Sequence, residues 1–245
     1  DVLADVYAFI SNIDNEVGPK EGFDGIWEAA KALDDEALSK IGYLLKDITG
    51  DDVPELLIGS FEKDDTAYTN NEIYLIYTLQ GEEPEIVLYG WNRNAYSLKD
   101  DNSLFYQGSS GAAMSAFGIY HISNDGESVC NDFYFTYPND NDPSVIELFH
   151  NTTGIFYNED GEKLDMTLDE FWALQDEMSE GTSKIEGKPF SKLDAKIIEK
   201  ANEKPSVPGT DLLDGEWVLS GVEVEGEKLT AEEAGLESEI TITST

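Results

Sequence analysis

Cysteine is almost absent from this sequence. Cys130 stands alone among the 245 residues, which excludes an intramolecular disulfide and a metal site built from several thiolates. It lies in the apolar run SVCNDFYFTY, so we predict a buried structural thiol rather than a nucleophile. Histidine is scarce too, and His150 has no second histidine at ligand spacing, so the sequence does not indicate a zinc site.

Basic residues are also few. The chain has 15 Lys and Arg against 52 Asp and Glu, a formal net charge of −37. Such a field repels phosphate backbones and anionic lipid and favours cations, so nucleic acid is excluded as a partner. No apolar run reaches the roughly 20 residues that a membrane-spanning helix needs. Hydrophobic content of 40% is nevertheless typical of a globular protein.

The apolar pattern changes period along the chain. Steps of three and four residues from Val2 to Ile13 predict a helix, followed by a second helix around 26–33 and a short one near 36–41. The runs GYLLKDI, PELLIGSF, NEIYLIYTL and PEIVLYGW then predict strands. Later, Thr167 and Glu170 form a capping box, which predicts a helix whose apolar face holds Phe171, Leu174 and Met178.

Turn residues divide the strands into hairpins. Gly81 to Pro84, Asp125-Gly126 and Asp160-Gly161 fit tight turns, with no long helix between the strands they join. The fold class we predict is therefore α+β, with N-terminal helices packed on a twisted antiparallel meander sheet. We predict a main domain at 1–200, a Pro/Gly-containing linker at 201–212 and a short C-terminal β segment at 213–245.

The stretch DITGDDVPEL is the most informative one. The side-chain oxygens of Asp47, Thr49, Asp51 and Glu55, with the carbonyl of Val53, alternate as ligands of a hard cation do, so calcium is the one cofactor that we consider. A complete EF-hand is excluded, because the twelfth position holds the apolar Ile58. The competing hypothesis, which the sequence favours, is a metal-free turn whose Asp side chains accept hydrogen bonds from nearby amides.

Three segments resemble one family. They are Asp47 to Leu56, Arg93 with Tyr96, and Gly108 to Ala113, in the order found in uncharacterised secreted lipoproteins of Gram-positive gut bacteria. Many of those proteins carry a calcium-like loop and end in a small lipocalin-like β-domain. Residues 213–245 are similar to the opening of such a domain. The resemblance implies a bacterial extracellular or cell-surface location, and membrane attachment only through a lipid anchor whose cysteine is not in this sequence.

Other candidate sites are weaker. Ser110 and His121 lack the Gly-x-Ser-x-Gly elbow of a hydrolase, and we predict that His121 is a partly buried strand residue. The small residues around Ser110 instead predict either a close approach of this strand to another backbone or a sharp bend in the strand. Asp140 and Asp142 lie in a second candidate cation loop, for which a solvated turn is the simpler interpretation.

Aromatic residues mark the predicted strands. They either stack on sugar rings or pack across the sheet, and packing accounts for them more simply. The residues are Trp91, Tyr96, Tyr106, Tyr120, Tyr134 and Tyr137. The function we predict is a non-catalytic extracellular module that binds a carbohydrate or protein ligand. The alternative is an extracellular hydrolase of glycans or peptides that uses paired carboxylates with raised pKa values.

Overall fold

The computed structural model describes residues 2–61, 71–81, 83–156, 159, 161–182 and 186–203. In the C-terminal part it describes the backbone of four strands, β12 (Gly215–Val218), β13 (Val222–Val224), β14 (Glu227–Leu229) and β15 (Glu239–Ile242). The chain divides into two compact units, 1–201 and 202–245, next to the boundary predicted at residue 200. Most of the predicted linker lies outside the described residues. Within the described ranges, no helix has both the length and the apolar character needed to cross a membrane.

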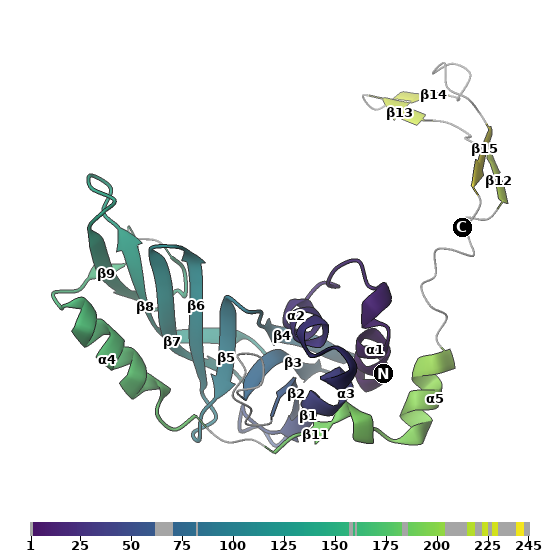
Figure 1. Cartoon of the computed structure of the whole chain (residues 1–245), viewed down its shortest axis with the longest axis horizontal. Coiled ribbons are helices and arrows are strands. Elements are labelled where there is room, and N and C mark those ends of the chain that lie inside the picture. Colours follow the sequence, from purple (N-terminus) through teal and green to yellow (C-terminus); the bar gives the residue numbers. More distant parts are fainter. Residues whose placement is uncertain are drawn as a thin grey trace. The chain divides into compact units, whose positions relative to one another are not determined.

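Helices precede and follow a large antiparallel sheet in the first unit (Figure 1). The helices are α1 (Val2–Ser11), α2 (Asp24–Leu33), α3 (Ala37–Lys40), α4 (Leu168–Ser179) and α5 (Ala195–Glu203), with 3-10 turns at Ile13–Asn15, Asp34–Glu36 and Phe190–Lys192. The strands are β1 (Ile41–Lys46), β2 (Glu55–Ser60), β3 (Glu72–Gln80), β4 (Glu83–Tyr89), β5 (Asn94–Leu98), β6 (Leu104–Gly111), β7 (Met114–Ile122), β8 (Ser128–Pro138), β9 (Ile146–Asn151), β10 (Glu162–Lys163) and β11 (Lys188–Pro189).

The sheet follows the order of the chain almost throughout. Its path is β10-β9-β8-β7-β6-β5-β3-β2-β1-β11, and β4 pairs with β3 beside this path. Every pair is antiparallel, as expected when tight turns join consecutive strands. Two strands pair with the same edge of β3. Residues 75–80 of β3 pair with β4, whereas Glu72 and Ile73 pair with β5.

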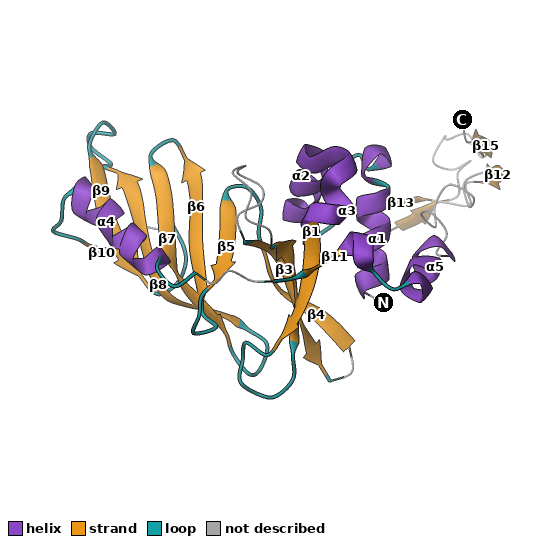
Figure 2. Cartoon of the chain, turned by 60° about the horizontal axis from the view of Figure 1, so that its bottom comes forward, coloured by secondary structure: helices purple, strands orange, loops and turns teal. Residues whose placement is uncertain are grey.

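The N-terminal helices cover one end of the sheet. Buried residues of α1 and α2, including Phe9 and Ile26, pack with Ile41, Ile58 and Tyr74 of β1, β2 and β3. α2 lies very close to the chain after β4, since a Cβ on Gly25 would lie 2.4 Å from the carbonyl oxygen of Gly90. Figure 2 shows α1, α2 and α3 gathered near β1, away from the β5–β9 part of the sheet.

α4 covers the other end of the sheet. Phe171 is fully buried and packs on Phe105, Phe117 and Leu148 of strands β6, β7 and β9. The opposite face of the sheet holds a third cluster, in which Tyr106, Phe133 and Phe135 of β6 and β8 pack with residues of β2 and β3. Residues of both ends of the sheet therefore share one core, although the helices at the two ends do not.

The structure confirms the coarse fold prediction. The chain is α+β, the sheet is antiparallel, and Thr167 caps α4 by accepting from Glu170 N at 3.2 Å. The prediction placed the helical layer at the N-terminus, whereas α4 lies between β10 and β11 in the chain and α5 follows β11. In the second unit, β12 pairs with β15 and β13 with β14, each antiparallel.

Candidate functional site

The loop between β1 and β2 is closed by the side chain of Asp47. Its Oδ1 accepts from the N–H of Gly50 at 2.6 Å, and its Oδ2 accepts from the N–H of Asp52 at 3.0 Å. These bonds lower the pKa of Asp47, with the Gly50 N–H as the largest cause, because they favour the ionised carboxylate. Both bonding partners have positive φ, +84° at Gly50 and +69° at Asp52, as a tight turn of this kind requires.

Glu55, at the other end of this loop, points into the core. It is fully buried, and its Oε2 accepts from Ile48 N at 3.0 Å while its Oε1 accepts from Thr78 Oγ1 at 3.2 Å. The side chain of Glu55 faces the core because side chains alternate between the two faces of a strand. Leu57, two residues later, faces the core as well. Glu55 therefore joins the loop to β3.

The predicted calcium ligands do not converge in this loop. Asp51 Oδ1 accepts from Val53 N at 2.8 Å, so each of the three carboxylates bonds a different part of the structure. Among the described residues, which include the whole loop, no three His, Cys, Asp or Glu side chains form a group suited to a metal ion. The hydrogen bonds expected of the alternative, a metal-free turn, are all present, and calcium binding stays a prediction.

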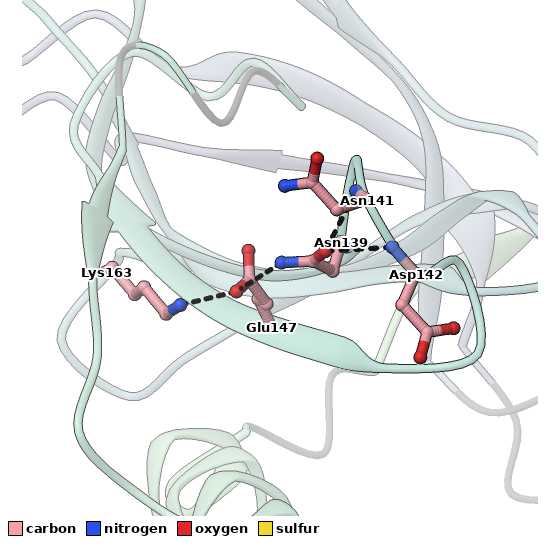
Figure 3. A network of polar contacts seen from close by, with 5 residues as sticks. All are labelled: Asn139, Asn141, Asp142, Glu147 and Lys163. Carbon is pink, nitrogen blue, oxygen red and sulfur yellow. Dashed lines mark hydrogen bonds and ion pairs between the residues drawn. The ribbon is translucent and has the colours of Figure 1, made fainter.

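The second candidate cation loop, which follows β8, is also built from local hydrogen bonds (Figure 3). Asn139 Oδ1 accepts from the backbone N–H groups of Asn141 and Asp142 at 2.9 and 3.0 Å, and Asn139 Nδ2 donates to Glu147 Oε1 at 2.8 Å. Lys163 pairs with Glu147, whereas the carboxylate of Asp142 points away from that pair. The loop is a hydrogen-bonded turn, as predicted.

Ser110 and His121 are not a catalytic pair. The register of β6 and β7 places Ser110 beside the turn that joins them and His121 near the far end of β7, where its Nδ1 contacts Asn131 Oδ1 at 2.6 Å. Cys130 is half-buried, less than the buried thiol that was predicted, but this burial raises the pKa of the thiol and so disfavours the nucleophilic thiolate. His150 contacts Asp132 Oδ1 at 3.0 Å.

Two of the segments that carry the family resemblance meet in space. Arg93 Nε donates to Ser109 Oγ at 3.1 Å, and Ser109 N donates to the carbonyl of Arg93 at 3.0 Å. A Cβ on Gly108 would lie 2.8 Å from that same carbonyl, which is the close backbone approach predicted for this small-residue run. Tyr96, which lies in the same segment as Arg93, packs against Tyr106 with the two rings tilted and their centroids 5.2 Å apart.

Most strand tyrosines are packing residues. Tyr96, Tyr106 and Tyr120 contact one another within the core, with ring centroids 5.2 to 5.7 Å apart. Burial raises the pKa of Tyr96 to about 12, so its phenol stays protonated at neutral pH. This confirms for these three residues that cross-strand packing, rather than a ligand surface, explains their presence.

A second aromatic pair has a different setting. Tyr89, which is 41% exposed, lies with its ring centroid 5.9 Å from that of Trp91, at the end of β4. Trp91 and Asn94 exchange two backbone hydrogen bonds, of 3.1 and 2.7 Å, which hold the intervening residues in a tight turn. Arg93 is exposed on that turn. We call Tyr89, Trp91, Arg93 and Ser109 the Arg93 patch.

Arg93 is unusual in this acidic chain. It is the single arginine among 245 residues, yet no carboxylate pairs with it in the part of the chain that the structure describes. A guanidinium has five N–H donors, and among the described residues only Ser109 accepts from one of them, the Nε–H. The two terminal nitrogens are left to bond solvent or a ligand.

Two carboxylates lie next to this patch. Glu28 of α2 accepts from the N–H of Asn92 at 2.7 Å, within the turn that carries Trp91 and Arg93. Glu72 of β3 is largely buried; this burial, and then the charge of Glu28, raise the pKa of Glu72 to about 7. We call Glu28 and Glu72 the acid pair. Glu72 therefore changes charge near neutral pH, unlike an ordinary glutamate.

Sequence reasoning missed most of this arrangement. Glu28 and Asn92 are 64 positions apart, and only the packing of Gly25 against Gly90 brings them together. One signal was available in the sequence, because Arg93 and Tyr96 form one of the segments that carry the family resemblance. No protein-family model, curated protein or solved structure matches the chain.

Proposed function

We propose that this chain is a non-catalytic extracellular module that binds neutral carbohydrate through the Arg93 patch. The observation that carries the proposal is the pair of the exposed Tyr89 and the half-buried Trp91, beside an arginine with no carboxylate partner among the described residues. The extracellular placement rests on the acidic composition and on the family resemblance.

The aromatic pair provides a surface for a sugar ring. The two rings are inclined by 34°, and one of them is 41% exposed, so apolar ring faces meet solvent next to polar groups. Such rigid amphipathic side chains bury apolar area at a low cost in conformational entropy. A pyranose ring, with apolar C–H faces and a polar rim, has the matching chemistry.

Arg93 and the net charge together select a neutral ligand. The terminal N–H groups of Arg93 can donate to hydroxyl groups at the rim of a sugar, as Ser109 already accepts from its Nε. A polyanionic glycan is disfavoured, because the chain carries a formal charge of −37 and repels extended anions. Neutral oligosaccharides avoid that repulsion.

The test is a binding titration with neutral oligosaccharides. Maltohexaose, cellohexaose, xylohexaose and mannohexaose are each titrated by calorimetry into the wild-type chain, Trp91→Ala and Arg93→Lys. We expect one of these sugars to bind, and Trp91→Ala to weaken it by about tenfold or more, as loss of an aromatic anchor does. Arg93→Lys retains the charge but loses the planar set of donors, so it should also weaken binding.

Trp172 provides the matched control. It is 39% exposed on α4, outside the Arg93 patch, and contacts Phe171. Trp172→Ala should bind the same sugar as the wild type does. Equal binding by Trp91→Ala and wild type, or a loss confined to Trp172→Ala, would contradict the proposal.

The acid pair favours a second candidate, hydrolysis of the same glycans. Glycoside hydrolysis uses two carboxyl groups, one of which is protonated at the working pH, and the raised pKa of Glu72 meets that second condition. In this case the oligosaccharide that binds is also cleaved, the rate declines above about pH 7, and Glu72→Gln abolishes cleavage while binding persists. An oligosaccharide that binds and stays intact during prolonged incubation excludes this candidate.

A further inference from the structure

β4 has a free edge. In the described part of the chain it pairs with β3 alone, and it lies beside the main path of the sheet. Pro84 lies within it, opposite Leu79, and a proline inside a strand is tolerated where its missing N–H would have faced away from the neighbouring strand. Since backbone groups alternate in direction along a strand, Ile86, two residues later, also presents its backbone polar groups outward.

One face of this edge is apolar. Leu79 is 50% exposed and Ile86 is 39% exposed, on the same face of the sheet as Tyr77. The strand register aligns four residues in one row, Leu45, Leu56, Tyr77 and Ile86, of which Leu56 and Tyr77 are partly buried against the cluster of the N-terminal helices. A strand added beside β4 would extend this row with its own apolar side chains, which would contact Ile86.

The other face of this edge is acidic. Glu83 and Glu85 are exposed, and Glu85 pairs with Thr78, whose hydroxyl bonds Glu55 on the core side of β3. Neither has a basic partner among the described residues. A strand that pairs with β4 would therefore place alternate side chains beside apolar residues on one face and beside carboxylates on the other.

We infer that the β4 edge binds, by strand addition, an extended polypeptide segment in which Lys or Arg alternates with apolar residues. Main-chain hydrogen bonds to an open edge supply affinity, and the two-faced character of Glu83–Tyr89 supplies specificity. A second copy of this chain is a poor occupant. Antiparallel pairing of two β4 strands about Pro84 would place Glu83 of each copy opposite Glu85 of the other, in a chain of net charge −37. This interaction goes beyond sugar binding.

The probe is a short fluorescent peptide in which Lys alternates with Val, titrated with the full chain and followed by anisotropy. Three control peptides separate the contributions. One has Glu in place of each Lys, one has the same composition in two blocks, and one is N-methylated at every second backbone nitrogen. We expect only the alternating unmethylated peptide to bind, because it alone has complementary charge, one apolar face and free backbone donors.

Two double variants of equal charge locate the site. Glu83→Lys with Glu85→Lys should weaken binding by about tenfold or more, since like charges then face each other across the added strand. Glu162→Lys with Glu177→Lys changes the net charge equally, at exposed positions on β10 and α4, and should weaken it by less than about threefold. Thermal melting of both variants verifies that they fold.

Three outcomes overturn the inference. Equal weakening by both double variants would mean that the peptide responds to overall charge alone. Equal binding of the block or N-methylated peptide would mean that no strand is added. Sedimentation of the free chain could show a dimer. A dimer that Ile86→Lys abolishes, but that the control variant Glu162→Lys with Glu177→Lys retains, would assign the edge to a second copy.

Discussion

Replacement of Glu72 by Gln makes a specific prediction about stability and pH. The pKa of Glu72 is raised from its ordinary value of 4.5 to about 7, first by burial and then by the charge of Glu28. Between these two values the folded chain holds a proton that the unfolded chain has released, so the stability of the wild type declines as pH rises. Below about pH 4.5 both states are protonated, and above about pH 7 the full cost of the buried charge is present.

The magnitude follows from the two pKa values. One pKa unit corresponds to ~1.4 kcal/mol, so the difference between 4.5 and about 7 costs the folded state at most about 3 kcal/mol above neutral pH. Gln resembles the protonated carboxyl group in shape and carries no charge. Glu72→Gln should therefore be nearly as stable as the wild type at about pH 4.5, and more stable by up to about 3 kcal/mol at about pH 8.

The assay is urea unfolding of both proteins at several pH values. The comparison isolates Glu72 and its coupling to Glu28, because the remaining carboxylates contribute equally to both proteins. Glu28→Gln is the matched variant, in which the pH dependence should move to lower pH but persist, since burial is the larger cause. A difference between Glu72→Gln and wild type that does not change between about pH 4.5 and 8 would refute the reasoning.

Variants at three further positions test the fold and the loop. Replacement of a glycine inside a helix by alanine ordinarily stabilises a protein by up to ~1 kcal/mol. Gly25→Ala should instead destabilise the chain by about 1–3 kcal/mol in urea unfolding, because the new Cβ would lie 2.4 Å from the carbonyl oxygen of Gly90. A gain in stability would contradict this packing. Thr167→Ala should cost about 1 kcal/mol and Thr167→Ser much less, and equal losses would exclude the capping role. Asp47→Ala should lower the melting temperature in calcium-free buffer, because it removes the hydrogen bonds from Gly50 and Asp52. Millimolar calcium should leave the melting temperature of the wild type unchanged. A rise with calcium that Asp47→Ala abolishes would show a metal site.

Local signals predicted the elements of the fold well. The short apolar run PELLIGSF predicted β2, and the Thr167–Glu170 pair predicted the start of α4, because each signal acts within a few residues of the chain. The antiparallel order followed from short turns alone. The close contact between α2 and the end of β4 was not predictable, since it depends on glycines 65 residues apart.

The candidate site was predicted only in part. Glu55 was interpreted as a loop ligand, although its position two residues before Leu57 was a sign that it faces the core. Arg93 and Gly108 were noted as motif residues, but their contact through Ser109 required the register of β5 and β6. Glu72 resembled any solvated strand residue in sequence, because its raised pKa arises from burial beside a helix residue far along the chain.

The most direct test of carbohydrate binding follows the indole N–H signals of the four tryptophans by NMR. The signal of Trp91 is assigned with a Trp91→Phe variant, and the sugar that binds in calorimetry is then titrated into the wild-type chain. We predict that the Trp91 signal shifts in a saturable way while that of Trp172 stays in place. A saturable shift of another tryptophan with Trp91 unchanged would contradict the assignment of binding to the Arg93 patch.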